Sequence, residues 1–191
     1  SRIIKQAKRF NNFVIVDYSS AHPNDIYQSL KQSGSKNAID TFEKRRGLWN
    51  KAILDVEEAD VVVVNSPYVL NSLIRNGVEK QKIVINNLPI DIEKIPHKNS
   101  YKLSNRINIG YSGRFVSWKG CDVLLKVVEK LSYRYPNIAL HIYGSIESHY
   151  YGNDLFIKLL KSGNIVEYGI VDHPLLFEYL RDMDIYSFLS Y

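Results

Sequence analysis

The chain has 191 residues, of which 45% are hydrophobic and 24% charged, the composition of a globular protein large enough to bury a core. No run of about 18 apolar residues occurs, so we predict no membrane-spanning helix. The single cysteine excludes a disulfide framework and a cysteine-based metal site. The formal net charge of +5 suits anionic partners such as nucleotides, lipid head groups or nucleic acid.

Nucleic acid is the partner that the sequence supports least. The 14 tyrosines could stack on bases, but they are scattered and no basic stripe runs between them, so we expect no nucleic-acid binding. The polar start of the chain, residues 1–6, has neither an initiator methionine nor a signal-peptide pattern, so we expect the sequence to begin inside a longer chain. Together with the lone cysteine, this fits a cytoplasmic protein.

The first apolar run, Phe13 to Val16, predicts a short buried strand. A polar loop over residues 17–25 follows it and would lie at the ligand edge of an open α/β sheet. Asp17 or His22 in this loop could contact an acceptor or transfer a proton. Ordinary turn chemistry is the alternative, because polar residues and a proline are also what a turn requires.

A long amphipathic helix is predicted over residues 41–59. The basic cluster at residues 44–46, near its start, could bring the chain to a membrane surface as a peripheral protein, or it could simply face solvent. The all-valine run 61–64 that follows predicts a strand buried on both faces, as in parallel sheets. The apolar face of the helix consists of Phe42, Trp49, Ala52, Ile53, Val56 and Ala59.

The next helix is predicted to begin at Ser66 and Pro67, with serine as N-cap and proline in the first position, and Gly77 ends it as a C-cap residue. Residues 83–85 predict one more strand. Residues 86–106 lose all periodicity and are rich in Asn, Pro, Lys and Ser. Because loops of this length are uncommon inside one domain, we predict an interdomain hinge rather than a surface loop.

The most regular part of the chain runs from residue 107 to residue 144. A strand at 107–111, a loop that ends at Gly120, an amphipathic helix and a strand at 138–143 predict one right-handed βαβ unit. The predicted helix face is Leu124, Val127, Val128, Leu131 and Tyr135, and Pro136 stops the helix. Further elements are predicted at 153–162 (helix), 165–168 (strand), 174–182 (helix) and 184–189 (strand).

Glycine turns follow both strands of this unit, at the edge where parallel sheets bind ligands. Beside Gly113, Arg114 offers a planar fork of donors that matches phosphate oxygens. Lys119 adds a point charge near a helix start, whose free N–H groups favour anions. Gly144, in the second turn, lets a ligand approach the backbone. Neither the Walker sequence nor the dinucleotide fingerprint is present, so the loop predicts a phosphate site of another kind. A turn with two solvated cations is the alternative.

The pattern of Gly113-Arg114, four residues, Lys119-Gly120 and a helix resembles the donor-site signature of the retaining GT-B glycosyltransferases of group 1, also called family 4. Other stretches resemble, in order and spacing, the family's acidic segment before a strand and serine, its step into the interdomain linker, and the two segments that precede its paired-glutamate motif. These stretches are residues 58–66, 77–87, 168–171 and 184–190, and the resemblance covers residues 60–191.

The resemblance implies an α/β fold of GT-B type with Rossmann-like parallel sheets. It implies an incomplete acceptor-side domain at residues 1–88, an interdomain linker at 89–105 and a truncated donor-binding domain at 106–191. It further implies transfer of a sugar from a nucleotide-diphosphate sugar, with retention of configuration, to a glycan or lipid-linked acceptor. The nucleotide sugar is then a substrate, and no metal or other cofactor is expected.

The resemblance also assigns roles to individual residues. It implies that Gly113, Arg114 and Lys119 hold the donor diphosphate, and that the two cations stabilise the charge on the leaving phosphate. The donor or nucleobase pocket would be formed by Gly144, Gly169, Ile170 and Val171. The family's functional histidine lies near the end of the first strand, close to but not at His22, which is the catalytic candidate there. We interpret His141, in the middle of a strand, as a packed sheet residue.

Two other functions remain open. A GT-B sugar-nucleotide epimerase would share the architecture and the diphosphate pocket, but it would need carboxylates in the cleft. A nucleotide-binding module without turnover is the other alternative, because the family's paired glutamates follow the segment at residues 184–190 and are absent from this chain. We therefore expect this chain alone to be inactive although its parent is an enzyme, since losing part of a site costs several powers of ten in rate.

Overall fold

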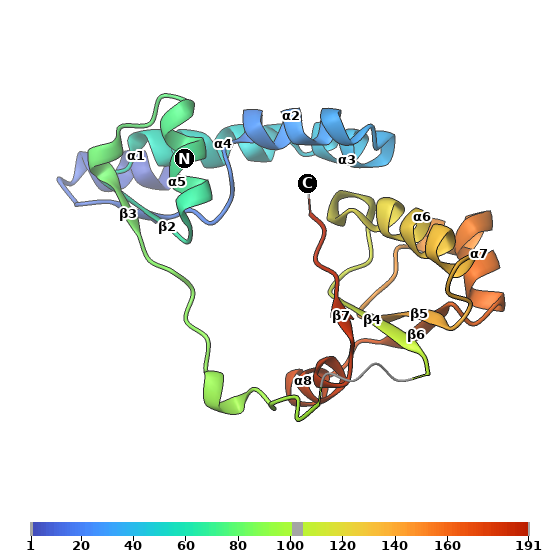
Figure 1. Ribbon diagram of the computed structural model, residues 1–191. Helices are drawn as coiled ribbons and strands as arrows, with labels where there is room; N and C mark the ends of the chain where they lie inside the picture. Colours follow the sequence, from blue (N-terminus) through green and yellow to red (C-terminus); the bar gives the residue numbers. More distant parts are fainter. Residues whose placement is uncertain (1, 101–104, 191) are drawn as a thin grey trace. The chain divides into compact units, whose positions relative to one another are not determined.

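The computed structural model describes residues 2–100 and 105–190 and divides the chain into two compact units, Ser1–Ile90 and Asp91–Tyr191. Each unit has its own parallel sheet and its own core, and each is considered by itself (Figure 1). Residues 101–104 of the predicted linker lie outside the described residues. No helix in the described parts of the chain is long and apolar enough to cross a membrane.

The first unit is built on a parallel sheet with the strand order β1-β2-β3. The strands are β1 (Ile15–Asp17), β2 (Val61–Val64) and β3 (Ile83–Ile85). In register, Ile15 pairs with Val61, and Val62 pairs with Ile83. The helices of this unit are α1 (Arg2–Arg9), α2 (Pro23–Ser33), α3 (Lys36–Lys44), α4 (Arg46–Glu58) and α5 (Pro67–Arg75), and a 3-10 turn, Lys80–Lys82, precedes β3.

The core of the first unit lies on one face of its sheet. Val62 and Val64 are completely buried, whereas the alternate valines of β2 are only half-buried, so the prediction of burial on both faces is wrong. The predicted strand at 13–16 is also displaced, because Phe13 lies outside β1 and is 70% exposed. Ile15, the first residue of the edge strand β1, is exposed as well.

The single helix predicted over residues 41–59 is in fact two helices, α3 and α4, with the break at Arg45. Aromatic rings stack across the break. The ring of Phe42 lies 5.5 Å from that of Tyr27 on α2 and 5.9 Å from that of Trp49 on α4. One aromatic stack thus joins three helices, and the apolar positions that suggested one long face belong to two short ones.

The serine start of α5 is confirmed. The Ser66 hydroxyl accepts a hydrogen bond from the backbone N–H of Val69 at 3.3 Å, and Pro67 is the first helical residue. The predicted end is displaced by one residue, since Asn76 is the C-cap and Gly77, with φ of 93°, follows it.

The second unit is built on a parallel sheet with the strand order β6-β5-β4-β7. Figure 1 shows α6 and α7 on one side of this sheet and α8 on the other. The strands are β4 (Ile107–Ser112), β5 (Ile138–Tyr143), β6 (Ile165–Gly169) and β7 (Ile185–Tyr186). The helices are α6 (Cys121–Ser132), α7 (Asp154–Lys161) and α8 (His173–Arg181), with 3-10 turns at Ile92–Lys94, Ser117–Lys119 and Ser148–Gly152.

The main core of the second unit lies between the sheet and the helices α6 and α7, with Phe115 completely buried at its centre. The helix face predicted for α6 is right at Leu124 and Val128, which are buried. It is wrong at Val127, which is 41% exposed, and at Tyr135, which lies beyond the end of the helix. The buried face of α6 consists of Cys121, Leu124, Leu125 and Val128, with Leu131 partly buried beside it.

The opposite face of this sheet is polar in its middle. The Nε2 atom of His141 lies 2.9 Å from Asn108 Oδ1, and its Nδ1 lies 3.1 Å from the Tyr168 hydroxyl. A neutral imidazole with its proton on Nε2 satisfies both contacts, and burial, with a smaller effect from Arg106, lowers the pKa of His141. His141 is therefore the packed sheet residue that the sequence predicted.

The last predicted strand, residues 184–189, shortens to β7 at Ile185–Tyr186. It is an edge strand that pairs only with β4, through Ile109 and Gly110. Gly110 allows the chain before β7 to approach, because a Cβ atom there would lie 2.7 Å from Met183 Cγ.

Candidate functional site

The carboxyl edge of the sheet in the second unit brings three predicted glycines side by side. The Gly113 N–H donates to the Tyr143 carbonyl at 2.8 Å, at the end of the neighbouring strand β5. The Gly144 N–H in turn donates to the Gly169 carbonyl at 2.7 Å, at the end of β6. The turn after β4 is thus hydrogen-bonded to the end of β5, and the turn after β5 to the end of β6. This is the edge at which ligands of parallel sheets bind.

The glycines are required for different reasons. A Cβ atom on residue 144 would lie 2.1 Å from the Gly113 carbonyl oxygen, so Gly144 is where two backbone segments touch. No heavy atom among the described residues lies within 4 Å of the corresponding positions at Gly113 and Gly169, so these two leave open space. The protein's own backbone thus occupies the side-chain position of residue 144, and the approach of a ligand to this turn stays a prediction.

The loop that carries Arg114 is fixed from both sides. The Tyr111 hydroxyl donates to the Arg114 carbonyl at 2.8 Å. The next residue, Phe115, donates its N–H to the Ser145 carbonyl at 2.8 Å and accepts from the Glu147 N–H at 3.1 Å, while its ring is completely buried. The backbone of Arg114 is therefore held firmly, whereas its side chain is exposed.

The two cations of the loop lie over aromatic rings. The guanidinium carbon of Arg114 is 5.6 Å from the centre of the Trp118 ring, and the ammonium nitrogen of Lys119 is 5.5 Å from the centre of the Phe188 ring. Within the described residues, neither cation forms an ion pair with a carboxylate. Their hydrogen-bond donors are therefore available to an external anion.

The N-terminus of α6 follows directly after Lys119. Gly120 is its N-cap, with φ of 71°, and no side chain caps the helix there. A Cβ atom on Gly120 would lie 2.8 Å from Leu189 Cβ, so the segment after β7 packs closely against this turn. The positive end of a helix dipole and two cations thus belong to one loop.

The predicted nucleobase segment follows β6. Ile170 is 84% exposed directly after Gly169, and Val171 is half-buried. An exposed isoleucine at a strand end can serve as an apolar wall for a planar ring. Next to it, Tyr168 stacks on Tyr143 with the ring centres 4.5 Å apart.

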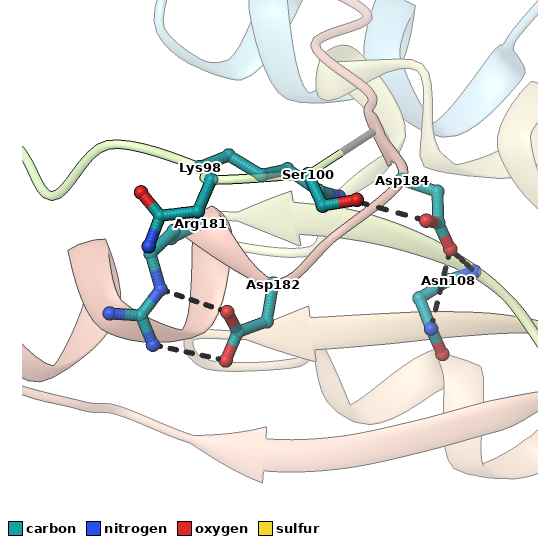
Figure 2. Close-up of a pocket in the computed structure, with 7 residues that line it drawn as sticks. Lys98, Ser100, Asn108, Arg181, Asp182 and Asp184 are labelled. Carbon is teal, nitrogen blue, oxygen red and sulfur yellow. Dashed lines mark hydrogen bonds and ion pairs between the residues drawn. The ribbon is translucent and has the colours of Figure 1, made fainter. Parts of the chain in front are cut away.

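A polar cavity of about 550 Å³ lies at the other end of β4 (Figure 2). Lys98 donates to the Met183 carbonyl at 2.6 Å and lies 3.7 Å from the Asp184 carboxylate. Asp184 also accepts from the backbone N–H of Asn108 at 2.8 Å. Arg181 is paired with Asp182 at 2.9 Å. Because its charges are internally paired, this cavity is not the predicted phosphate site, and nothing in the sequence pattern had singled it out.

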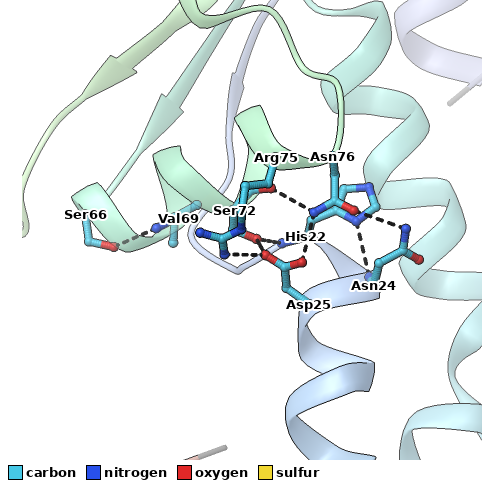
Figure 3. Close-up of polar contacts among 8 residues, drawn as sticks. All are labelled: His22, Asn24, Asp25, Ser66, Val69, Ser72, Arg75 and Asn76. Atoms are coloured by element: carbon cyan, nitrogen blue, oxygen red, sulfur yellow. Dashed lines mark hydrogen bonds and ion pairs between the residues drawn. The ribbon is translucent and has the colours of Figure 1, made fainter.

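His22, in the first unit, has a structural role (Figure 3). It is the N-cap of α2, its Nδ1 accepts from the Asn24 N–H at 3.2 Å, and its own N–H donates to the Ser72 hydroxyl at 2.8 Å. Burial lowers the pKa of His22, and the nearby carboxylates of Asp25 and Glu57 offset part of that effect. The predicted loop over residues 17–25 is therefore shorter, because Pro23 already begins a helix.

Asp25 is the centre of a network that the sequence did not reveal. It accepts hydrogen bonds from the Ser72 hydroxyl at 2.7 Å, from Arg75 at 2.6 Å and from the Asn76 amide at 3.0 Å (Figure 3). Burial raises the pKa of Asp25, but these hydrogen bonds and the Arg75 charge outweigh it and hold the pKa below its usual value. The network fastens α2 to α5.

Asp17, the other candidate of the predicted loop over residues 17–25, ends β1 and accepts a hydrogen bond from the Ser19 hydroxyl at 3.3 Å.

No group of three or more His, Cys, Asp or Glu side chains is arranged to hold a metal ion in the parts of the chain that the structure describes.

The family model for glycosyl transferases group 1 matches residues 92–191, which include the whole carboxyl edge described above. The chain belongs to this family.

Two curated relatives extend the similarity into the first unit. An uncharacterised 41.2 kDa protein in the cps region of Klebsiella pneumoniae is 29% identical over 151 residues, 75% of this chain and 40% of that protein. An uncharacterised glycosyltransferase of Methanocaldococcus jannaschii is 30% identical over 173 residues, 84% of this chain and 41% of that protein. The chain therefore spans about two-fifths of the length of these relatives.

Solved structures share the fold at lower identity. HepE from Anabaena, crystallised with UDP and glucose, is 14% identical with a TM-score of 0.66, and the match covers 98% of this chain and 49% of HepE. Sucrose-phosphate synthase from Thermosynechococcus elongatus is 18% identical with a TM-score of 0.64, covering 95% of this chain and 46% of that protein. The α/β architecture with Rossmann-like parallel sheets is thus the GT-B type that the sequence predicted.

Proposed function

We propose that this chain forms the donor-binding part, and a portion of the acceptor side, of a retaining glycosyltransferase that uses a nucleotide-diphosphate sugar. One observation carries the proposal. The carboxyl edge of a parallel sheet presents Arg114 and Lys119 without carboxylate partners among the described residues, on a loop whose backbone is fixed. An edge of this kind suits an anionic ligand of nucleotide size.

The two cations have separate tasks in this proposal. Arg114 offers parallel N–H donors to two oxygens of the diphosphate, whereas Lys119 offers a compact charge beside the N-terminus of α6. Negative charge grows on the leaving phosphate as the sugar departs. Cations that are already in place stabilise this charge more than they stabilise the ground state, and that difference accelerates the reaction.

The nucleobase and the sugar are assigned to the neighbouring strand ends. Ile170 and Val171 provide the apolar wall for the base, and the open space at Gly113 and Gly169 leaves room for the ribose and phosphates. Crystals of HepE with UDP and with UDP-glucose, and of the pneumococcal transferase GtfA with UDP and GlcNAc, support a uridine nucleotide as the first donor to test. No metal or other cofactor is assigned a role.

All residues proposed to bind the donor lie in the second unit, so we assign the acceptor to the first unit. A glycan or a lipid-linked glycan is the proposed acceptor class, with the protein in the cytoplasm. The basic turn between α3 and α4, where Lys44, Arg45 and Arg46 are all exposed, would support peripheral contact with an anionic membrane surface.

The two alternatives differ in what they require. An epimerase would use the same diphosphate pocket but would need carboxylates in the cleft, and the sequence supports it by nothing beyond the fold. A binding module without turnover would use the same cations and the same base wall. The choice between module and transferase therefore rests on turnover by a chain that also carries the sugar contacts.

The proposal is tested by calorimetric titration of the 191-residue chain with UDP, GDP and ADP, and with UDP-glucose, GDP-mannose and ADP-glucose. A partial pocket should bind its preferred nucleoside diphosphate with Kd between about 10 µM and 1 mM, roughly −7 to −4 kcal/mol. One base should be preferred over the other two. Binding of all three no tighter than inorganic phosphate would contradict the proposal.

A further inference from the structure

Both cations of the loop are held by rings rather than by acids. Arg114 lies over Trp118 with 5.6 Å between its guanidinium carbon and the ring centre, and Lys119 lies over Phe188 at 5.5 Å. Both distances are within the range at which the electron-rich face of a ring attracts a cation. One ring comes from the loop itself, and the other comes from the segment after β7.

An aromatic ring can hold a cation without occupying its hydrogen-bond donors or cancelling its charge, whereas a carboxylate does both. The attraction between a cation and the face of a ring uses none of the N–H donors of the cation, so these donors stay available for phosphate oxygens. A carboxylate would occupy those donors and cancel the charge, and it would have to be displaced before phosphate could bind. The contact with the ring therefore limits side-chain motion without neutralising the site, which lowers the entropy lost when the anion arrives.

The backbone beneath both rings is itself fixed. Trp118 sits in the 3-10 turn Ser117–Lys119 and is half-buried. Phe188 is 67% exposed, but its neighbours are anchored: the Ser187 N–H donates to the Gly110 carbonyl at 2.8 Å, and Leu189 packs against Gly120. An exposed phenylalanine on an anchored segment, with a lysine over its face, adds nothing to the core and lies beside the loop.

We propose that Trp118 and Phe188 are positioning residues for the phosphate loop, holding Arg114 and Lys119 over their rings so that both cations keep free donors for a diphosphate. This inference rests on the proposed function and adds to it the means by which the two cations are preorganised. It also makes the segment after β7 a part of the donor site, because Phe188 belongs to that segment.

The test uses inorganic pyrophosphate, which carries the diphosphate without a base, and uridine, which carries a base without the diphosphate. Trp118→Leu and Phe188→Leu should each weaken pyrophosphate binding by about two- to fivefold and leave uridine binding unchanged. Trp118→Phe and Phe188→Tyr keep a ring and should restore most of the loss. Tyr133→Leu is the matched control, since Lys158 lies 5.4 Å from the Tyr133 ring centre, beyond the far end of α6.

Several outcomes would overturn the inference. If both leucine variants bind pyrophosphate like the parent while Arg114→Ala and Lys119→Ala lose it, the diphosphate site stands and the positioning role is wrong. If the alanine variants also bind like the parent, the proposed function itself fails. If uridine binding falls as much as pyrophosphate binding, the rings are merely structural. Should Trp118→Leu not fold, Phe188→Leu decides, because that ring is largely exposed.

Discussion

The carbonyl oxygen of Gly113 occupies the place that a side chain on residue 144 would take, since a Cβ atom there would lie 2.1 Å from it. Gly144 also has φ of 142°, a conformation that side chains disfavour. The turn after β5 and the loop from Gly113 to Gly120 after β4 therefore fit together only while residue 144 is glycine.

The first prediction is that Gly144→Ala destabilises the protein strongly, by about 3 kcal/mol or more, because backbone strain and a backbone clash add together. Gly163→Ala is the control, since its φ of 76° is also positive but its Cβ position is open. That variant should lose only about 1 to 2 kcal/mol. Urea denaturation of both variants measures the difference, and equal losses would show that the clash is relieved by movement of the loop.

The second prediction concerns the cations. Arg114→Ala and Lys119→Ala should each weaken binding of a nucleoside diphosphate by about 1.5 to 3 kcal/mol, because each removes a charge-assisted contact. Arg114→Lys should also be damaging if the contact is a fork of two parallel bonds. Calorimetry gives the affinities. Lys126→Ala removes an exposed charge from α6 and should bind like the parent.

The third prediction is the order of tryptic cleavage in the linker region. The Lys94 side chain is 78% exposed, whereas that of Lys98 is 21% exposed and held by Met183 and Asp184. Trypsin should therefore cut after Lys94 before it cuts after Lys98. Asp184→Asn should speed the second cut by weakening the hold on Lys98. Mass spectrometry of early fragments decides, and a first cut between residues 107 and 144 would refute the predicted domain boundary.

The fourth prediction is a pH dependence of stability from His141. Folding lowers its pKa, so the folded state binds fewer protons than the unfolded state. The stabilisation is fully present above the unfolded pKa of about 6.5 and decreases as the pH falls below it, by at most about 1.4 kcal/mol per pH unit. Urea midpoints at pH 7.5 and 5.5 should differ less in His141→Gln than in the parent.

The fifth prediction is that this 191-residue chain, taken alone, binds a nucleoside diphosphate without transferring or hydrolysing the sugar. The paired glutamates that the family resemblance implies are not among its residues, and catalytic groups of one site act together. Nucleotide release from UDP-, GDP- and ADP-sugars is the assay. Robust release would show that these glutamates are dispensable for chemistry.

The strands of the sheets were largely predictable from the sequence. β3 and β5 have the predicted bounds, because runs of valine, isoleucine and other apolar residues end at asparagine or glycine. The break at Arg45 was not predicted, although Gly47, a poor helix former, lies two residues after it. The stacking of Tyr27, Phe42 and Trp49 across the break could not be read from the sequence, because it joins residues of three helices.

The candidate site was predictable where its residues follow a short pattern or end a predicted strand. The glycines and cations of the loop follow a short pattern, so Arg114 and Lys119 could be singled out. The ring of Phe188 could not, because it reaches the loop through the fold rather than through the sequence. The same holds for Asp25 and Asn76, whose hydrogen bond joins positions 51 residues apart.

The order β6-β5-β4-β7 also has a consequence for synthesis on the ribosome. β4 is a central strand, yet one of its partners is translated much later, since the hydrogen bond between Asn108 and Asp184 spans 76 residues. Until Asp184 and β7 emerge, the N–H and C=O groups on that side of β4 have no strand to pair with. In a nascent chain β4 is thus an edge strand for most of the translation of this unit, and it becomes a central strand only when the two residues of β7 pair with it.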